Sequence, residues 1–270
     1  MPLSRDEKYL NLILDPIRVC KEYKPKFGGG AKGSGLTYSD FNLLYGNDPF
    51  YSWLGLNHPL MYSAHKAAGG MTSLYRQIGI GCEKLFREIL KDELGLTEQQ
   101  VKWSYQIPAA NNKTRTLSLD GRIRISDLRD DIDKRRVKKW ILEICENIQV
   151  DTNIANSLQG IVFEVRQGYK SKDSKRQNAD IANKTKAYSQ GYLPCAIILS
   201  MQIDDDIITR YRAAQWAILT GKIAQATQYN SSFSFMNEII GFNLAAFFEG
   251  HKDIIREEVI DVLETLISAE

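Results

Sequence analysis

The chain has 270 residues, of which 43% are hydrophobic and 25% are charged, as in an ordinary soluble globular protein with a sizeable core. Its formal net charge is only +2, which excludes a polycation that binds nucleic acid through its overall charge. The sequence has no run of 18 apolar residues and no signal-peptide core, so it predicts a cytoplasmic protein that does not enter a membrane.

The charges are unevenly distributed along the chain. Residues 166–186 contain seven Lys or Arg and two Asp, whereas residues 249–270 contain seven acids. This segregation predicts a basic face and an acidic one. The four cysteines, at positions 20, 82, 145 and 195, lie far apart in mostly apolar surroundings, which indicates buried, reduced thiols.

The first 70 residues combine a helical pattern, a glycine-rich loop and an aromatic-rich stretch. The apolar spacing in residues 5–24 predicts a helix that Pro16 kinks or stops early. The glycine-rich loop that follows is not a phosphate-binding P-loop, because Lys32 precedes Gly33; it either wraps a partner or is a plain linker. Residues 37–70 predict short helices and loops, and their His58 and His65 are interpreted as non-ligands.

The clearest helix is expected over residues 72–95. Thr72 or Ser73 is a candidate N-cap, and Gly95 is suited to end the helix. Glu83 falls at the edge of the apolar stripe, where a carboxylate is either a solvated edge residue or a site residue.

Strand and helix patterns alternate through the rest of the chain. Strands are expected at residues 101–107, 115–125, 160–167 and 193–203, and helices at 133–147, 174–191 and 251–268. This order predicts an α/β fold with a central mixed β-sheet flanked by helices.

Glu164 and Arg166 lie in an otherwise apolar strand. Alternate residues of a strand share a face, so these two side chains point the same way. An unpaired buried carboxylate costs roughly several kcal/mol, so Glu164 needs a cationic partner. Either Arg166 supplies a static ion pair, or a divalent metal is held with a second acid.

Asp120 is the best candidate for that second acid, because it lies in the preceding strand. Two hard oxygen ligands, completed by water and a phosphate, describe a Mg²⁺ site. The alternative is structural, since Asp120-Gly121 is also a favoured hairpin turn pair.

The order of these elements resembles the PD-(D/E)xK nuclease superfamily, and within it a type II restriction endonuclease. The resemblance covers roughly residues 74–203: a helix with Glu83, a strand with Asp120, a strand with Glu164-x-Arg166, a helix and an apolar strand. It implies that Asp120 and Glu164 are Mg²⁺ ligands and that Glu83 is an additional site acid. It also implies a basic residue two positions after Glu164 that positions the attacking water.

The sequence departs from the family pattern at two positions. Arg166 stands where Lys is expected, and Leu119 stands where Pro usually precedes the Asp. Arg stays protonated, so Arg166 can hold water or stabilise the phosphorane but cannot act as a general base. Lys170 or Lys172 is a candidate for the usual lysine role, and Asp151 is a fallback acid.

The basic run after Glu164 is expected to contact DNA. Lys and Arg reach phosphates, and Gln and Asn can pair with base edges; the alternative is the solvated start of a basic helix. The candidate DNA-binding residues are Lys172, Ser174, Lys175, Arg176, Gln177, Asn178, Arg210 and Arg212. Arg210 and Arg212 either read bases or merely flank a core Trp216.

Three functional interpretations follow. The first is a Mg²⁺-dependent site-specific endonuclease acting on double-stranded DNA as a homodimer, with the helix at 133–147 or 251–268 as its dimer face. The others are a non-catalytic DNA-binding module and a repair or junction nuclease of the same superfamily. In the first interpretation, residues 1–70 form a helical and loop region, in the same domain or as a DNA-clamping subdomain, and residues 71–270 form the nuclease core with its helical C-terminus.

Overall fold

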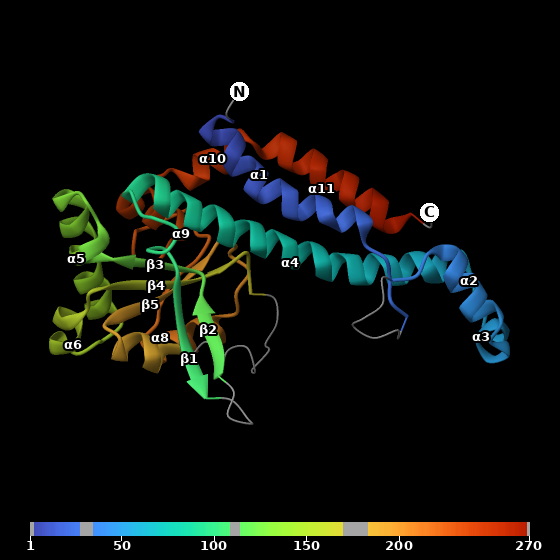
Figure 1. Cartoon of the computed structure of the whole chain (residues 1–270), viewed down its shortest axis with the longest axis horizontal. Helices are drawn as coiled ribbons and strands as arrows, with labels where there is room; N and C mark the ends of the chain where they lie inside the picture. Colours follow the sequence, from blue (N-terminus) through green and yellow to red (C-terminus); the bar gives the residue numbers. More distant parts are fainter. Residues whose placement is uncertain (1–2, 28–34, 109–113, 170–182, 269–270) are drawn as a thin grey trace. The chain divides into compact units, whose positions relative to one another are not determined.

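The computed structural model describes residues 3–27, 35–108, 114–169 and 183–268 (Figure 1). The chain divides into two compact units. The first comprises residues 1–81 and 249–270, and the second comprises residues 82–248. The long helix α4 (Pro59–Leu94) contributes residues to both.

The first unit is helical. Its elements are α1 (Arg5–Arg18), the 3₁₀ turn η1 (Val19–Glu22), α2 (Tyr38–Gly46), α3 (Pro49–Trp53), the N-terminal part of α4 and α11 (Lys252–Ile267). A capping box between Ser4 and Glu7 starts α1. The expected helix over residues 5–24 is shorter than predicted: Pro16 is accommodated inside α1, and the α-helix ends two residues later in η1.

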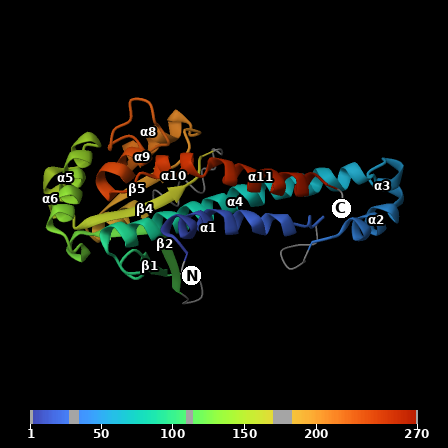
Figure 2. The same ribbon diagram turned by 90° about the horizontal axis from the view of Figure 1, so that it is seen from above.

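The helices α1, α4 and α11 lie side by side (Figure 2). Glycines on α4 permit this approach: a Cβ added at Gly70 would lie 2.4 Å from the side chain of Leu266, and one at Gly81 would lie 3.1 Å from the carbonyl oxygen of Leu12. Glu258 of α11 accepts hydrogen bonds from Arg18 at 2.8 Å and from Lys21 at 2.6 Å. The predicted amphipathic helix over residues 251–268 is therefore confirmed, and part of its apolar face, including Leu266, is buried inside this unit.

The helix α4 begins 13 residues earlier than the pattern over residues 72–95 predicts. Thr72 and Ser73 are not N-caps, because both lie inside the helix, where the Thr72 hydroxyl donates to the carbonyl of Ala68. Gly95 ends α4 as expected, with a left-handed φ of +64°.

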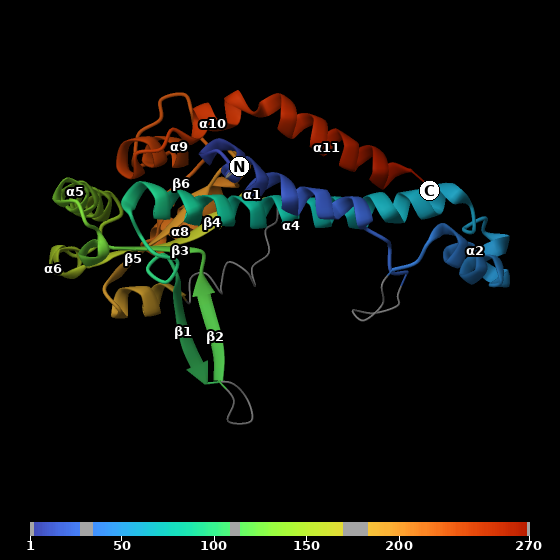
Figure 3. The ribbon, with the colours of Figure 1, turned by 45° about the horizontal axis from the view of Figure 1, so that its top comes forward.

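The second unit contains two sheets (Figure 3). Strands β1 (Trp103–Pro108) and β2 (Thr114–Leu119) form an antiparallel hairpin. Strands β3 (Gly121–Arg124), β4 (Gly160–Arg166), β5 (Tyr192–Ile198) and β6 (Ala217–Leu219) form a mixed sheet in that order, with β3 antiparallel to β4 and the other pairs parallel. The α/β class and a mixed sheet are thus confirmed, although the segment predicted as one strand over residues 115–125 is divided between the two sheets.

Helices flank the mixed sheet. They are η2 (Ile125–Asp127), α5 (Asp131–Asn147), α6 (Thr152–Ser157), a helical segment at 183–189, α8 (Asp205–Ala213), α9 (Ser232–Phe235), the π-helical turn η3 (Met236–Ile240) and α10 (Leu244–Gly250). On one face, Phe163 of β4 packs against Phe86 of α4 at 5.0 Å and Phe235 of α9 at 5.8 Å. Trp140 of α5 packs on Phe235 in turn, at 4.7 Å.

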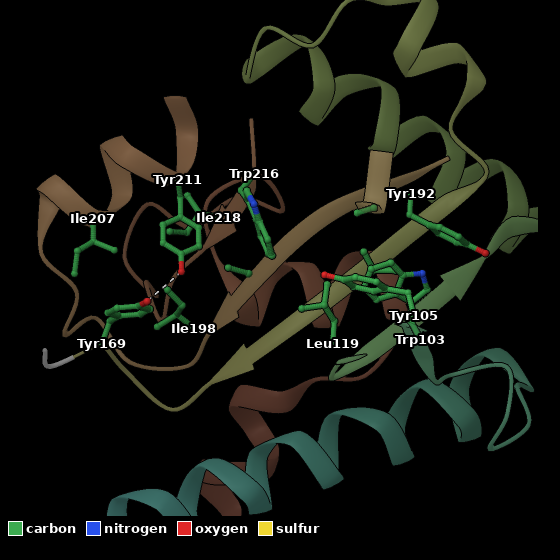
Figure 4. Close-up of a cluster of buried hydrophobic side chains, with 13 residues drawn as sticks. Trp103, Tyr105, Leu119, Tyr169, Tyr192, Ile198, Ile207, Tyr211, Trp216 and Ile218 are labelled. Atoms are coloured by element: carbon green, nitrogen blue, oxygen red, sulfur yellow. Dashed lines mark hydrogen bonds between the residues drawn. The ribbon is translucent and has the colours of Figure 1, made fainter. Parts of the chain in front are cut away.

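The opposite face of the sheet is covered by an aromatic cluster (Figure 4). The hairpin supplies Trp103, Tyr105 and Leu119, and helix α8 supplies Ile207 and Tyr211. These side chains pack with Val162, Ala196 and Ile198 of the strands, so β4 is buried on both faces, as its continuous apolar run requires.

All four cysteines are buried and free, as predicted. Burial raises the pKa of the Cys82 thiol to about 12 and that of Cys145 to about 11, which keeps both protonated near neutral pH. Over the described ranges, none of the helices has the length and apolar character needed to cross a membrane.

Candidate functional site

Asp120 is fixed against the main chain on both sides of Glu164. Its own N–H donates to the carbonyl of Phe163 at 2.7 Å, and its Oδ2 accepts from the N–H of Val165 at 2.8 Å. Because Phe163 and Val165 are the two neighbours of Glu164 on β4, the structure brings the two predicted acids to one place in the sheet.

The predicted hairpin turn at Asp120-Gly121 is not present. Strand β2 pairs with β1 and strand β3 pairs with β4, so these two residues join separate sheets rather than two paired strands. Gly121 has another role: a Cβ at this position would lie 2.9 Å from the ring of Phe86, so the absent side chain lets α4 approach the strand. The placement of Asp120 within a continuous strand is corrected as well, since it occupies a bend between β2 and β3.

Glu164 and Arg166 point the same way and form an ion pair. Arg166 Nη2 lies 2.8 Å from Glu164 Oε1, and the two side chains are 7% and 14% exposed. The Arg166 guanidinium also lies 5.1 Å from the ring centre of Tyr169. Such a planar cation, held by a carboxylate and an aromatic face, has a defined orientation in a poorly hydrated place.

The helix α4 supports this junction through two residues one turn beyond Glu83. Phe86 packs on Phe163, and Arg87 donates to the carbonyl of Asp120 at 3.2 Å. Glu83 is four residues before Arg87, so both lie on the same side of α4. Its half-buried carboxylate also adds to the effect of burial that raises the pKa of Cys82.

Arg87 and Tyr169 were missed by the sequence interpretation. The signal for Arg87 was its spacing of four residues from Glu83, on the same helical face. Tyr169 gave no local signal, because its contact with Arg166 depends on a loop: its N–H donates to the carbonyl of Gln202, and its hydroxyl lies 3.0 Å from that of Tyr211.

Part of the predicted basic run lies outside the described residues. This holds for Lys170, Lys172, Ser174, Lys175, Arg176, Gln177 and Asn178, so their predicted roles stay predictions. The described flanks are well anchored, by the buried Tyr169 on one side and by Asn183, which accepts a hydrogen bond from the Tyr105 hydroxyl, on the other.

Arg210 and Arg212 lie on the exposed side of α8, close to its C-terminal end. Trp216 is fully buried and contacts Tyr211, with ring centres 5.6 Å apart, so it belongs to the aromatic cluster. Arg212 borders a cavity of about 360 Å³ that Asn147 and Tyr229 also line.

Asp151 and the two histidines have structural roles. Asp151 is exposed and caps α6, where its carboxylate accepts from the N–H groups of Asn153 and Ile154, so the fallback interpretation as a site acid is not supported by its position. His58 Nδ1 accepts from the Leu60 N–H, and His65 packs on Phe27 at 4.7 Å.

Within the described part of the chain, no group of three or more His, Cys, Asp or Glu side chains is arranged to hold a metal ion. The candidate site therefore consists of a pair of acids, Asp120 and Glu164, with Arg166 beside them. Comparisons with family models, curated proteins and solved structures find no match to this chain.

Proposed function

We propose that this protein is a Mg²⁺-dependent endonuclease that hydrolyses phosphodiester bonds of double-stranded DNA at a short specific site, as type II restriction endonucleases of the PD-(D/E)xK superfamily do. The observation that carries the proposal is the attachment of Asp120 to both neighbours of Glu164. Asp120 thereby adds a second carboxylate at a half-buried place that already holds one.

The donor set fits Mg²⁺. This ion is usually held by one or two protein carboxylates, with waters and substrate phosphates completing its octahedron, so a pair of acids is sufficient. Asp120 Oδ2 accepts from the Val165 N–H, and Glu164 Oε1 pairs with Arg166, so each carboxylate has a defined orientation. When bound, Mg²⁺ would neutralise phosphate charge and lower the pKa of a coordinated water.

The chain's own residues would orient the substrate. Asp120 and Glu164 would hold the cation, and their main-chain and ion-pair contacts fix both carboxylates before substrate arrives. Arg166 would donate to a phosphate oxygen, since it stays protonated and its guanidinium is already oriented by Glu164 and Tyr169. Glu83 remains a proposed additional acid, and Lys170 or Lys172 the proposed residue that positions the water.

The proposed substrate contacts lie on the basic run and on the exposed side of α8. Phosphate contacts release counterions, so binding should weaken steeply as salt is raised. Binding that is unchanged between low and moderate salt would contradict this part of the proposal. A homodimer would match a palindromic site, since a two-fold axis in the protein then coincides with one in the DNA.

Plasmid digestion tests the function. Wild-type protein is expected to give discrete fragments with Mg²⁺ and none with EDTA, and Asp120→Asn and Glu164→Gln are expected to abolish cleavage while DNA binding is retained. The matched control is Asp151→Asn, which neutralises an exposed acid whose carboxylate caps α6, and it is expected to cut like the wild type. Cleavage retained by Glu164→Gln would remove the metal assignment.

A second candidate, a non-catalytic DNA-binding module, is favoured by the 2.8 Å ion pair, because Arg166 already compensates the charge of Glu164. In the same assay it would give retarded but intact DNA. A repair or junction nuclease would instead cut at scattered or structure-dependent positions, which sequencing of the product ends would reveal.

A further inference from the structure

The first unit exposes an unusual number of large apolar side chains over a short stretch. Among the described residues, seventeen large hydrophobic side chains are exposed, and seven of them fall between positions 43 and 60. We call this set the apolar platform: Leu43, Leu44, Phe50, Tyr51, Trp53, Leu54 and Leu60. Single exposed apolar residues are common, but a concentration of them marks an interaction surface.

The apolar platform belongs to ordered helices. Thr37 and Asp40 form a capping box at the start of α2, and Asp48 accepts from the N–H groups of Phe50 and Tyr51 at the start of α3. In the same helix as Leu43 and Leu44, Phe41 is fully buried against Phe27, Tyr45 and Tyr62. The outward apolar side chains are therefore held on a packed aromatic interior.

The charge of this stretch limits what can cover it. No Lys or Arg occurs between Lys32 and Lys66, which removes the cations that a DNA backbone or an anionic lipid surface requires. The only charged residue between Asp40 and Lys66 is Asp48, whose carboxylate is engaged as a helix cap. Protein interface cores have this composition, since they are depleted of charge and enriched in aromatic residues.

We propose that the apolar platform binds the same platform of a second copy of this chain, forming a two-fold symmetric dimer. In a two-fold symmetric contact, the same patch of each subunit faces its own copy, so any charge on the patch meets an identical charge. The apolar platform is nearly uncharged, so it can pair with its copy without this repulsion. The three aromatic side chains carry roughly 150–250 Å² each, and with the four leucines they supply an exposed area on the order of the ~800 Å² that each partner of a stable complex buries. Trp53, which is 81% exposed, is the expected anchor.

This proposal places the dimer contact on α2, α3 and the start of α4, not on the helices at 133–147 or 251–268. Helix α5 buries Val137, Trp140, Ile141, Ile144 and Cys145 within the second unit, and α11 buries Val262 and Leu266 within the first.

Sedimentation velocity of the full chain, without DNA or metal, tests the contact over roughly 1 to 100 µM, which brackets a micromolar dissociation constant. The wild type is expected to shift from monomer to dimer over this range. Trp53→Asp and Leu60→Asp are each expected to raise the dissociation constant by roughly 30-fold or more, as loss of an interface anchor does. The matched control is Ile223→Asp, since Ile223 is 69% exposed in the second unit; it should dimerise like the wild type.

Tryptophan fluorescence gives an independent readout. The chain has four tryptophans, and Trp103, Trp140 and Trp216 are at most 4% exposed, so acrylamide quenching reports on Trp53. Quenching is expected to fall as the wild-type concentration rises and to stay high at every concentration in Leu60→Asp.

Three results would overturn the proposal: a wild type that stays monomeric, a dimer that persists in both Trp53→Asp and Leu60→Asp, or a monomer that floats with phosphatidylcholine vesicles. The two variants lie on different helices, so a folding defect in one, seen by circular dichroism, leaves the other as the test. None of these measurements uses cleavage, so a failed dimer and a failed nuclease are distinguishable.

Discussion

The carboxylate of Asp120 accepts a hydrogen bond from the main-chain N–H of Val165, with 2.8 Å between Oδ2 and N. This bond joins the bend between two sheets to the strand that carries Glu164. Because an N–H inside a sheet normally pairs with a neighbouring strand, Asp120 replaces a main-chain acceptor at the edge of β3. Asp120 therefore has a structural role in addition to its proposed catalytic one.

Two substitutions of Asp120 separate these roles. Asp120→Ala leaves the Val165 N–H without this acceptor and should lower the free energy of unfolding by about 1–3 kcal/mol. Asp120→Asn keeps an oxygen at the same place and should cost clearly less, although it removes the charge that a cation needs. Urea denaturation measures both. Equal destabilisation by the two variants would mean that the charge, and not the acceptor, holds the bend.

The ion pair between Glu164 and Arg166 can be tested by a double-mutant cycle. Glu164→Ala removes the carboxylate beside a guanidinium that is only 7% exposed, and should lower the free energy of unfolding on the order of 3 kcal/mol. Arg166→Met in the same chain removes the buried charge, so the double variant is expected to be more stable than Glu164→Ala alone. Additive losses in denaturant titrations would show that the pair is not coupled.

The strand that carries these residues was predictable from local pattern. Residues 160–166 form an apolar run that a buried strand requires, and the period of two in a strand places Glu164 and Arg166 on one face. The same holds for β5, which begins one residue before the predicted strand at 193–203, although it ends five residues earlier than predicted.

The sequence predictions are wrong where a contact with a residue far away in the chain overrides the conformation that the local sequence favours. Asp120-Gly121 has the composition of a hairpin turn, but Gly121 is required by the ring of Phe86, 35 positions earlier in the chain. Likewise Gly69 and Gly70 argue against a helix locally. They nevertheless lie inside α4, where a Cβ at Gly69 would collide with Tyr23 and one at Gly70 with Leu266, so these two close contacts require glycine. Neither pairing is visible in a single sequence.

Acid is expected to weaken the first unit through Glu258. A hydrogen bond from Lys21, together with one from Arg18, holds the pKa of the Glu258 carboxyl below its usual value near 4.5. Since the folded pKa is depressed, the stabilisation is fully present above pH ~4.5 and is lost as pH falls through the folded value. The melting temperature of Glu258→Gln should therefore lie below that of the wild type at pH 7, and the gap should shrink below pH ~4. A gap that widens in acid would contradict the assignment.

Gly121 and Gly79 form a matched pair for testing how α4 packs on the sheet. A Cβ at Gly121 would lie 2.9 Å from the Phe86 ring, whereas one at Gly79 meets nothing within 4 Å. Gly121→Ala should therefore lower the free energy of unfolding by about 1–3 kcal/mol through overpacking. Gly79→Ala should raise it by up to about 1 kcal/mol, because alanine favours the helix.

A second substitution locates the cause of the Gly121→Ala effect. Replacing Phe86 by Leu removes the ring that the new Cβ meets, so Gly121→Ala should cost less in the Phe86→Leu background than in the wild type. Because Gly121 follows Asp120, displacement of this strand should also disturb the bond from Val165, and cleavage should fall with stability. If Gly121→Ala is as stable as the wild type by urea denaturation, the close approach of α4 to the strand junction is wrong, and with it the contact between Arg87 and the carbonyl of Asp120.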